Sequence, residues 1–159
     1  MNYTTIEQSK KLLELGLKPE TADMSYGNFC VKGLGYCDQF RASLTPYTKE
    51  VEIYEENKKA YGIDKYDGVV AWEVLPCWSL NKLMELLPPS INHYDEADRC
   101  NKNYGLNLFR SYYHCCGYSF GPSLSQENHD TLYCCGGDTW IEAVYKTIIW
   151  GVQQGYLKV

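Results

Sequence analysis

The fold is decided by the C-terminal stretch GGDTWIEAVYKTIIWGVQQGYL, which spans residues 136–157. Two glycines and an aspartate turn the chain, and Thr139 with Glu142 three residues later predicts a capping box that starts a helix. Gly155 ends this helix. Its apolar side is wide and consists of Ile141, Val144, Tyr145, Ile148, Ile149, Trp150 and Val152. A helix that is apolar over so much of its circumference is expected to pack centrally against a sheet.

Two more helices are predicted from capping signals and apolar spacing. The first begins at Thr4 or Thr5 and ends at Gly16, after which Pro19 forbids continuation. The second is capped by Ser79 and stops at a pair of prolines. Its core stripe has the i, i+3, i+4, i+7 spacing of a helix face and consists of Leu80, Leu83, Met84 and Leu87.

Four segments have the composition and the boundaries of strands. They are residues 69–72, 91–94, 106–116 and 131–135. Pro76 is expected to end the first of these segments, residues 19–28 are expected to form a polar loop, and residues 29–31 could be a short strand. Residues 37–66 mix helical and strand-like spacing.

Helices gathered on one side of strands make a two-layer α+β domain with a mostly antiparallel sheet. We expect residues 1–159 to form one such domain, because this length is typical of a single domain. Segments 27–68 and 95–130 are predicted to be insertions on its core.

Charge and hydropathy exclude several classes of partner. The chain has 20 acidic and 15 basic residues and a net charge of −5, which argues against binding a nucleic acid polymer. No apolar run approaches the roughly 20 residues that cross a bilayer. The first eleven residues lack the apolar core of a signal peptide. The sequence therefore predicts a cytoplasmic protein that does not enter a membrane.

Eight cysteines are many for this length. Two pairs, Cys115 with Cys116 and Cys134 with Cys135, are adjacent in sequence, and a disulfide between neighbours is strained and uncommon. We therefore expect reduced thiols, as is usual in a cytosolic protein. Zinc is the alternative, but the sequence contains no CxxC or HxxxH spacing. No metal or cofactor is predicted.

Three segments carry a resemblance to known proteins. They are TTIEQSKKLLELGL with PETADM, PCWSLNKLMELLP, and GDTWIEAVYKTIIWGVQQGYL. The chain resembles a family of small uncharacterised α+β proteins that are common in gut anaerobic bacteria and in their phages and mobile elements. The resemblance covers about half of the chain. It implies an intracellular accessory protein of phage origin, in a bacterial host cell, and it brings no catalytic residues.

The sequence contains none of four common enzyme motifs. The nucleophile elbow, the P-loop, the dinucleotide-binding glycines and the HExxH zinc motif are absent. His114 and Cys116 would share a face of the strand over 106–116, and His93 with Asp95 and His129 with Asp130 are local candidates for metal-dependent hydrolysis. Each is as readily explained by chance adjacency or by solvated loops, so no catalytic residue is assigned.

Binding is better supported, first at the start of the middle helix. Trp78 and Ser79 come directly before that helix, where free N–H groups and the helix dipole favour an anion. An indole beside an anion site would suit a nucleotide. The plainer interpretation is that Ser79 only caps and Trp78 only packs.

A second set of candidates is predicted on the strand over 106–116. Its period of two places Arg110, Tyr112 and His114 on one face, where they offer a cation for phosphate, an aromatic platform and a further donor. Arg41 is another of only three arginines in the chain. The alternative is an ordinary exposed sheet face.

These observations lead to a hypothesis of non-catalytic binding of a small nucleotide-like ligand. In its concrete form the protein is a phage-encoded anti-defence sponge that sequesters an immune signal, either a cyclic oligonucleotide or an ADP-ribose derivative. A homo-oligomer would let subunits share the site. One alternative is an inhibitor module that docks on a host protein through its tyrosines, of which the chain has 15. The other is an enzyme that degrades such a signal.

Overall fold

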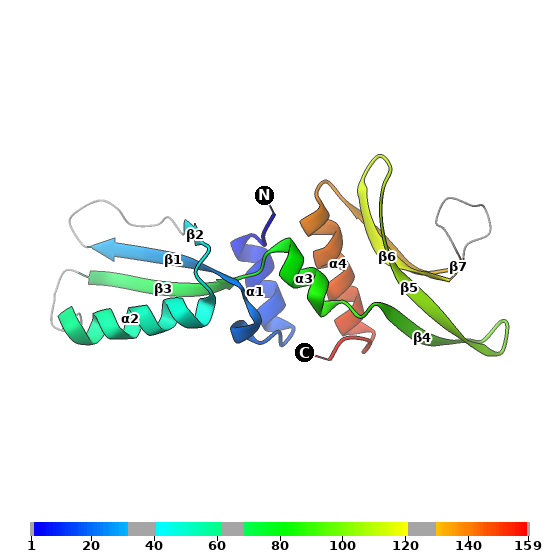
Figure 1. Cartoon of the computed structure of the whole chain (residues 1–159), viewed down its shortest axis with the longest axis horizontal. Coiled ribbons are helices and arrows are strands. Elements are labelled where there is room, and N and C mark those ends of the chain that lie inside the picture. Colours follow the sequence, from blue (N-terminus) through cyan, green and yellow to red (C-terminus); the bar gives the residue numbers. More distant parts are fainter. Residues whose placement is uncertain (1, 32–40, 62–68, 121–129, 159) are drawn as a thin grey trace. The chain divides into compact units, whose positions relative to one another are not determined.

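The computed structural model describes residues 2–31, 41–61, 69–120 and 130–158 (Figure 1). Within these ranges the strands pair only antiparallel, and four of them follow one another before the last helix, so the predicted α+β class is confirmed. The helices are α1 (Ile6–Glu14), α2 (Tyr47–Tyr61), α3 (Leu80–Leu86) and α4 (Trp140–Gln153), with a 3-10 turn η1 (Pro19–Thr21). The strands are β1 (Met24–Val31), β2 (Arg41–Ser43), β3 (Val69–Cys77), β4 (Ser90–Asp95), β5 (Cys100–Arg110), β6 (His114–Phe120) and β7 (Asp130–Gly137).

The chain divides into two compact units. The N-terminal unit is Tyr3–Ser79, and the C-terminal unit is Leu80–Val159 with the first two residues of the chain. The described strands follow the same division, in the order β2-β1-β3 in the first unit and β4-β5-β6-β7 in the second. The sequence pattern identifies strands but not their partners, so it does not separate the two sheets. The single domain over 1–159 stays a prediction.

Helix α1 begins and ends as its sequence predicts. The Thr5 hydroxyl accepts a hydrogen bond from the Gln8 backbone N–H, and the Gln8 side chain accepts one from the Thr5 N–H, at 3.2 and 2.9 Å. Gly16 then adopts a φ of +96°, which is costly for other residues. The Leu17 N–H donates to the Leu12 carbonyl at 3.0 Å, as in a Schellman motif.

In contrast to α1, two predictions for the N-terminal unit were wrong at their boundaries. Residues 24–28 belong to β1 rather than to a loop, because pairing with β3 satisfies their backbone groups. Pro76 does not end its segment but lies inside β3, opposite Ser25. An edge strand tolerates proline because its outer side needs no N–H donor. The described part of the mixed region consists of β2 and α2.

In the C-terminal unit the prediction of one strand over 106–116 was wrong. Strand β5 ends at Arg110, residues 111–113 form a turn, and β6 returns antiparallel from His114. The Ser111 N–H donates to the Tyr113 carbonyl at 3.0 Å within this turn. No glycine, proline or asparagine marks residues 111–113, so the usual sequence signal of a hairpin is missing.

Strands β5 and β6 are the two inner strands of this sheet and supply much of its core. Tyr104, Cys116 and Tyr118 are almost completely buried. The insertion on the core predicted over 95–130 stays a prediction.

Helix α4 packs against β6 and β7, as its apolar side predicts. The Thr139 hydroxyl accepts from the Glu142 N–H at 3.3 Å, whereas the Glu142 carboxylate accepts from the Asp138 N–H rather than from the capping residue. Thr147 is fully buried, and its hydroxyl donates to the Cys116 carbonyl at 3.2 Å. The middle of α4 is thereby tied to β6.

Candidate ligand-binding site

The β5–β6 hairpin brings two of the predicted binding residues together. Arg110 and His114 are cross-strand partners at its closed end, and the side chains of such partners lie on the same face of a sheet. The His114 ring meets the Trp140 indole edge to face, with 4.8 Å between ring centroids and 69° between ring planes. Because Trp140 is the first residue of α4, the contact joins the hairpin to the start of that helix.

Beside this contact lies a small apolar cavity, which we call the Trp140 pocket. Its volume is about 220 Å³, below the roughly 300–1,000 Å³ of sites for drug-sized ligands. It is therefore suited to one ring system rather than to a whole nucleotide. The lining residues come from α3, β5 and α4 and are Leu80, Asn81, Met84, Leu108 and Trp140.

Arg110 is the candidate cation nearest in sequence to the wall of the Trp140 pocket. It follows the lining residue Leu108 by two residues on β5, so both side chains leave the same face of the strand. Arg110 is exposed, and no other described residue forms an ion pair with it. A guanidinium next to an apolar cavity is suited to a ligand with a ring at one end and an anionic group at the other.

Tyr112 does not share the strand face predicted for it. It lies in the turn, where its N–H donates to the Ser111 hydroxyl at 2.6 Å, and its side chain is 99% exposed. Because residues 111–113 do not form a strand, the alternation of side chains between two faces does not apply to them. The predicted stacking platform beside Arg110 is therefore corrected to an exposed hairpin tip.

The roles predicted for Trp78 and Ser79 were wrong. Trp78 is 0% exposed and its indole N–H donates to the Thr21 hydroxyl at 3.0 Å, so neither ring face is free for a base. Ser79 donates from both its backbone N–H and its hydroxyl to the Asp23 carboxylate. A carboxylate of the protein already holds the position proposed for an anion.

Arg41 lies in a different unit from Arg110 and His114. It is the first residue of β2, is exposed, and pairs with Gly27 of β1. The structure therefore places the six predicted residues in three groups: Arg110 with His114 at the closed end of the β5–β6 hairpin, Tyr112 at the hairpin tip, and the remaining three in the N-terminal unit.

The candidate catalytic groups have other roles. Cys116 is 0% exposed, and burial raises the pKa of its thiol to about 11, which disfavours the nucleophilic thiolate. His93 shares a hydrogen bond of 2.7 Å between its Nδ1 and the Tyr156 hydroxyl. His129 lies outside the described residues.

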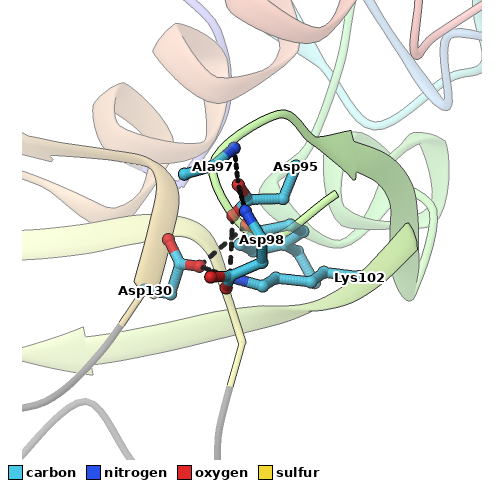
Figure 2. Close-up of polar contacts among 6 residues, drawn as sticks. Asp95, Ala97, Asp98, Lys102 and Asp130 are labelled. Atoms are coloured by element: carbon cyan, nitrogen blue, oxygen red, sulfur yellow. Dashed lines mark hydrogen bonds and ion pairs between the residues drawn. The ribbon is translucent and has the colours of Figure 1, made fainter. Parts of the chain in front are cut away.

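A cluster of carboxylates in the C-terminal unit has the donor atoms of a cation site. Asp95, Asp98 and Asp130 each offer an oxygen within 4.8 Å of the others. Figure 2 shows the Lys102 side chain reaching into this cluster, where its ammonium forms ion pairs with all three carboxylates. The protein's own cation thus fills the place that a metal would take, and the cluster ties the β4–β5 turn to the start of β7.

The electrostatics of this cluster agree with an internal ion-pair network. Hydrogen bonding to Lys102 is the main cause that lowers the pKa of Asp95 to about 2. The same carboxylates raise the pKa of Lys102, with Asp130 making the largest contribution. Tyr104 also donates to Asp130 at 3.2 Å. Each member of the cluster has partners, which favours a structural role.

Comparison with known proteins gives no relative. No family model matches the chain, and no curated protein or solved structure is significantly similar to it. The resemblance to proteins of gut bacteria and their phages stays a prediction. Within the described residues, no helix has both the length and the apolar character that crossing a membrane requires.

Sequence reasoning missed the pocket itself. Trp140 lies four residues before the buried Val144, on the buried side of α4, yet as the first residue of the helix it is only half-buried. Met84 was assigned to a core stripe, yet it is only half-buried and lines the cavity. Leu108 also lines the cavity and is 44% exposed. The pocket depends on how α3, β5 and α4 meet, which the pattern of one segment does not encode.

Proposed function

We propose that the protein binds a small ligand, without transforming it, in the Trp140 pocket and at Arg110. The proposal rests on an apolar cavity of about 220 Å³. Strand β5, which forms one wall of this cavity, also carries Arg110, which is exposed and forms no ion pair with another described residue. The ligand class is a nucleotide or a similar molecule with one flat ring and a phosphate.

The chemistry of the pocket matches the two ends of such a ligand. A ring of nucleobase size would fill the cavity and contact the Trp140 indole, and base–aromatic stacking contributes about 1–3 kcal/mol. The Arg110 guanidinium would donate two parallel hydrogen bonds to one phosphate. His114 lies beside both groups as a further donor, with its orientation fixed by the ring contact to Trp140.

A finer proposal concerns the biological role. We infer that the protein acts as a sponge, holding a cyclic oligonucleotide or an ADP-ribose derivative that serves as an immune signal of a bacterial host. Sequestration needs tight binding and stoichiometric protein rather than a catalyst, and a homo-oligomer would add contacts for the rest of such a ligand. This role rests on the family resemblance together with the ligand class of the pocket.

Calorimetric titration with adenosine monophosphate, ADP-ribose and cyclic dinucleotides tests the proposal. Losing one charge-assisted hydrogen-bonding partner costs about 1.5–3 kcal/mol, so Arg110→Gln is expected to weaken binding about 10- to 150-fold. Arg41→Gln is the matched control, because it removes an exposed arginine of the other unit.

Native mass spectrometry of the same samples separates binding from turnover. An adduct of unchanged ligand mass supports sequestration, whereas a product mass supports the enzyme alternative. The proposal fails if no nucleotide binds at micromolar concentration, or if Arg110→Gln binds as tightly as the unmodified chain.

A second candidate function is docking on a host protein. The observation that favours it is the exposure of three large side chains around the hairpin, which is 99% for Tyr112, 59% for Tyr113 and 44% for Leu108. Tyrosine is enriched at protein interfaces. Tyr112→Ser with Tyr113→Ser is expected to abolish capture of a host protein from lysate while leaving nucleotide binding intact.

A further inference from the structure

Four of the cysteines lie on two neighbouring strands. Strands β6 and β7 place Cys116 directly opposite Cys135, while Cys115 is opposite Gly136 and Cys134 is opposite Gly117. Successive side chains of a strand point to opposite faces. Cys116 and Cys135 therefore lie on the face covered by α4, and Cys115 and Cys134 lie on the other face as diagonal neighbours.

No other side chain of β6 or β7 lies between Cys115 and Cys134, although the Tyr113 side chain lies beside Gly136 and the Cys115 thiol donates to the Tyr113 carbonyl at 3.7 Å. Each of the two cysteines is paired across the strands with a glycine, Cys115 with Gly136 and Cys134 with Gly117, and these glycines carry no side chain. The strands also approach closely here, since a Cβ added to Gly117 would lie 2.7 Å from the Cα of Cys134. Cys134 is exposed and Cys115 is half-buried, so the two thiols share a site that solvent reaches.

Diagonal placement favours a bridging cation over a disulfide. Diagonal neighbours across two strands have Cα atoms about 7–8 Å apart, which exceeds the roughly 4.4–6.8 Å of disulfide-bonded cysteines. A metal ion between two thiolates, with bonds of about 2.3 Å each, spans sulfurs that are up to ~4.6 Å apart. Soft thiolates select soft ions such as Cu(I).

We propose that Cys115 and Cys134 form a two-coordinate thiolate site for a soft monovalent cation, with Cu(I) as its representative. On binding, each thiol forms a sulfur–copper bond and releases its proton to solvent. One Cu(I) and two thiols thus give a bis-thiolate complex of charge −1 and two protons, and no group is oxidised or reduced. The site is independent of the Trp140 pocket, because it occupies the opposite face of the sheet.

The electrostatics of the pair explain why a cation is the suitable partner. Burial and the neighbouring Cys115 thiol raise the pKa of Cys134, since two adjacent thiolates repel each other. A bound cation neutralises that repulsion. Affinity is therefore expected to rise with pH, because two protons leave for each ion bound.

The test is anaerobic titration of the reduced chain with Cu(I) against the chromophoric chelator bicinchoninate. Cys115→Ser and Cys134→Ser are each expected to lower the bound copper by one equivalent per chain. Cys100→Ser is the matched control, since Cys100 is an exposed cysteine of β5, and it is expected to retain that equivalent. Circular dichroism of each variant verifies that the sheet has folded.

Equal copper binding by the unmodified chain and by both folded Ser variants would overturn the proposal.

Discussion

Trp78 and Trp140 lie at comparable points of the sequence, and the structure uses them in opposite ways. Each stands at or just before the start of a helix. Trp78 is 0% exposed and its indole N–H is bonded to Thr21, whereas Trp140 is half-buried and lines a cavity. A tryptophan near a helix start therefore becomes part of a site only where neighbouring elements leave one of its faces uncovered.

The largest expected effect is on the free energy of unfolding, which should differ between substitutions of Trp78 and Trp140. Trp78→Ala is expected to lower the free energy of unfolding by about 3–5 kcal/mol, because it empties a fully buried site. Trp140→Ala is expected to cost about 1–2 kcal/mol, because its side chain is only half-buried. Urea unfolding followed by circular dichroism measures both. Equal costs for the two variants would contradict the comparison.

The helices show how much of the fold a single sequence contains. The capping residues Thr5 and Thr139 and the glycine at position 16 are local signals, and the structure confirms all three. Strand pairing is not local. The β5–β6 turn lacks the residues that normally mark one, so a strand over 106–116 was predicted where the chain in fact reverses.

The candidate site shows the same difference between local sequence signals and contacts that depend on the tertiary fold. Arg110 and His114 were identified because a cation and an imidazole are scarce and chemically distinct, although they meet as cross-strand partners and not along one strand. Trp140 was missed as a site residue because its environment is set by three separate elements. Residue type thus predicts candidates, whereas only tertiary packing decides which of them remain accessible.

The second prediction concerns the ligand rather than stability. Trp140→Ala is expected to weaken nucleotide binding about 5- to 150-fold, since stacking on one aromatic contributes about 1–3 kcal/mol. Trp140→Phe should restore part of this affinity because it keeps a ring in the pocket. Calorimetric titration measures both variants. If Trp140→Ala binds as tightly as the unmodified chain, the pocket is not where the base lies.

The third prediction concerns the hydrogen bonds that Ser79 makes to Asp23 instead of to a bound anion. Asp23→Asn removes the charged acceptor of two Ser79 hydrogen bonds and is expected to lower the free energy of unfolding by about 1–2 kcal/mol. Asp138→Asn, an exposed carboxylate of the C-terminal unit, serves as the control. A variant as stable as the unmodified chain would show that the hydrogen bonds from Ser79 to Asp23 do not stabilise the fold.

The smallest expected effect concerns the response of the C-terminal unit to acid. The pKa of Asp95 is lowered from 3.8 to about 2 in the folded chain, chiefly by hydrogen bonding to Lys102. Because the unfolded chain takes up this proton first, the pair stabilises the fold fully above about pH 4, and this contribution is lost as the pH falls toward 2. Asp95→Asn carries no such proton, so its stability should depend less steeply on pH in that window.

Urea unfolding at pH 2, 3, 4 and 6 measures this dependence, with Asp138→Asn as the control carboxylate outside the cluster. The difference in stability between the Asp95→Asn variant and the unmodified chain should shrink steadily from pH 4 to pH 2 and stay constant above pH 4. A constant difference across the whole range would mean that Lys102 draws its stabilisation from Asp98 and Asp130 alone. In that case the cluster joins the β5 lysine to β7 without needing the β4 carboxylate.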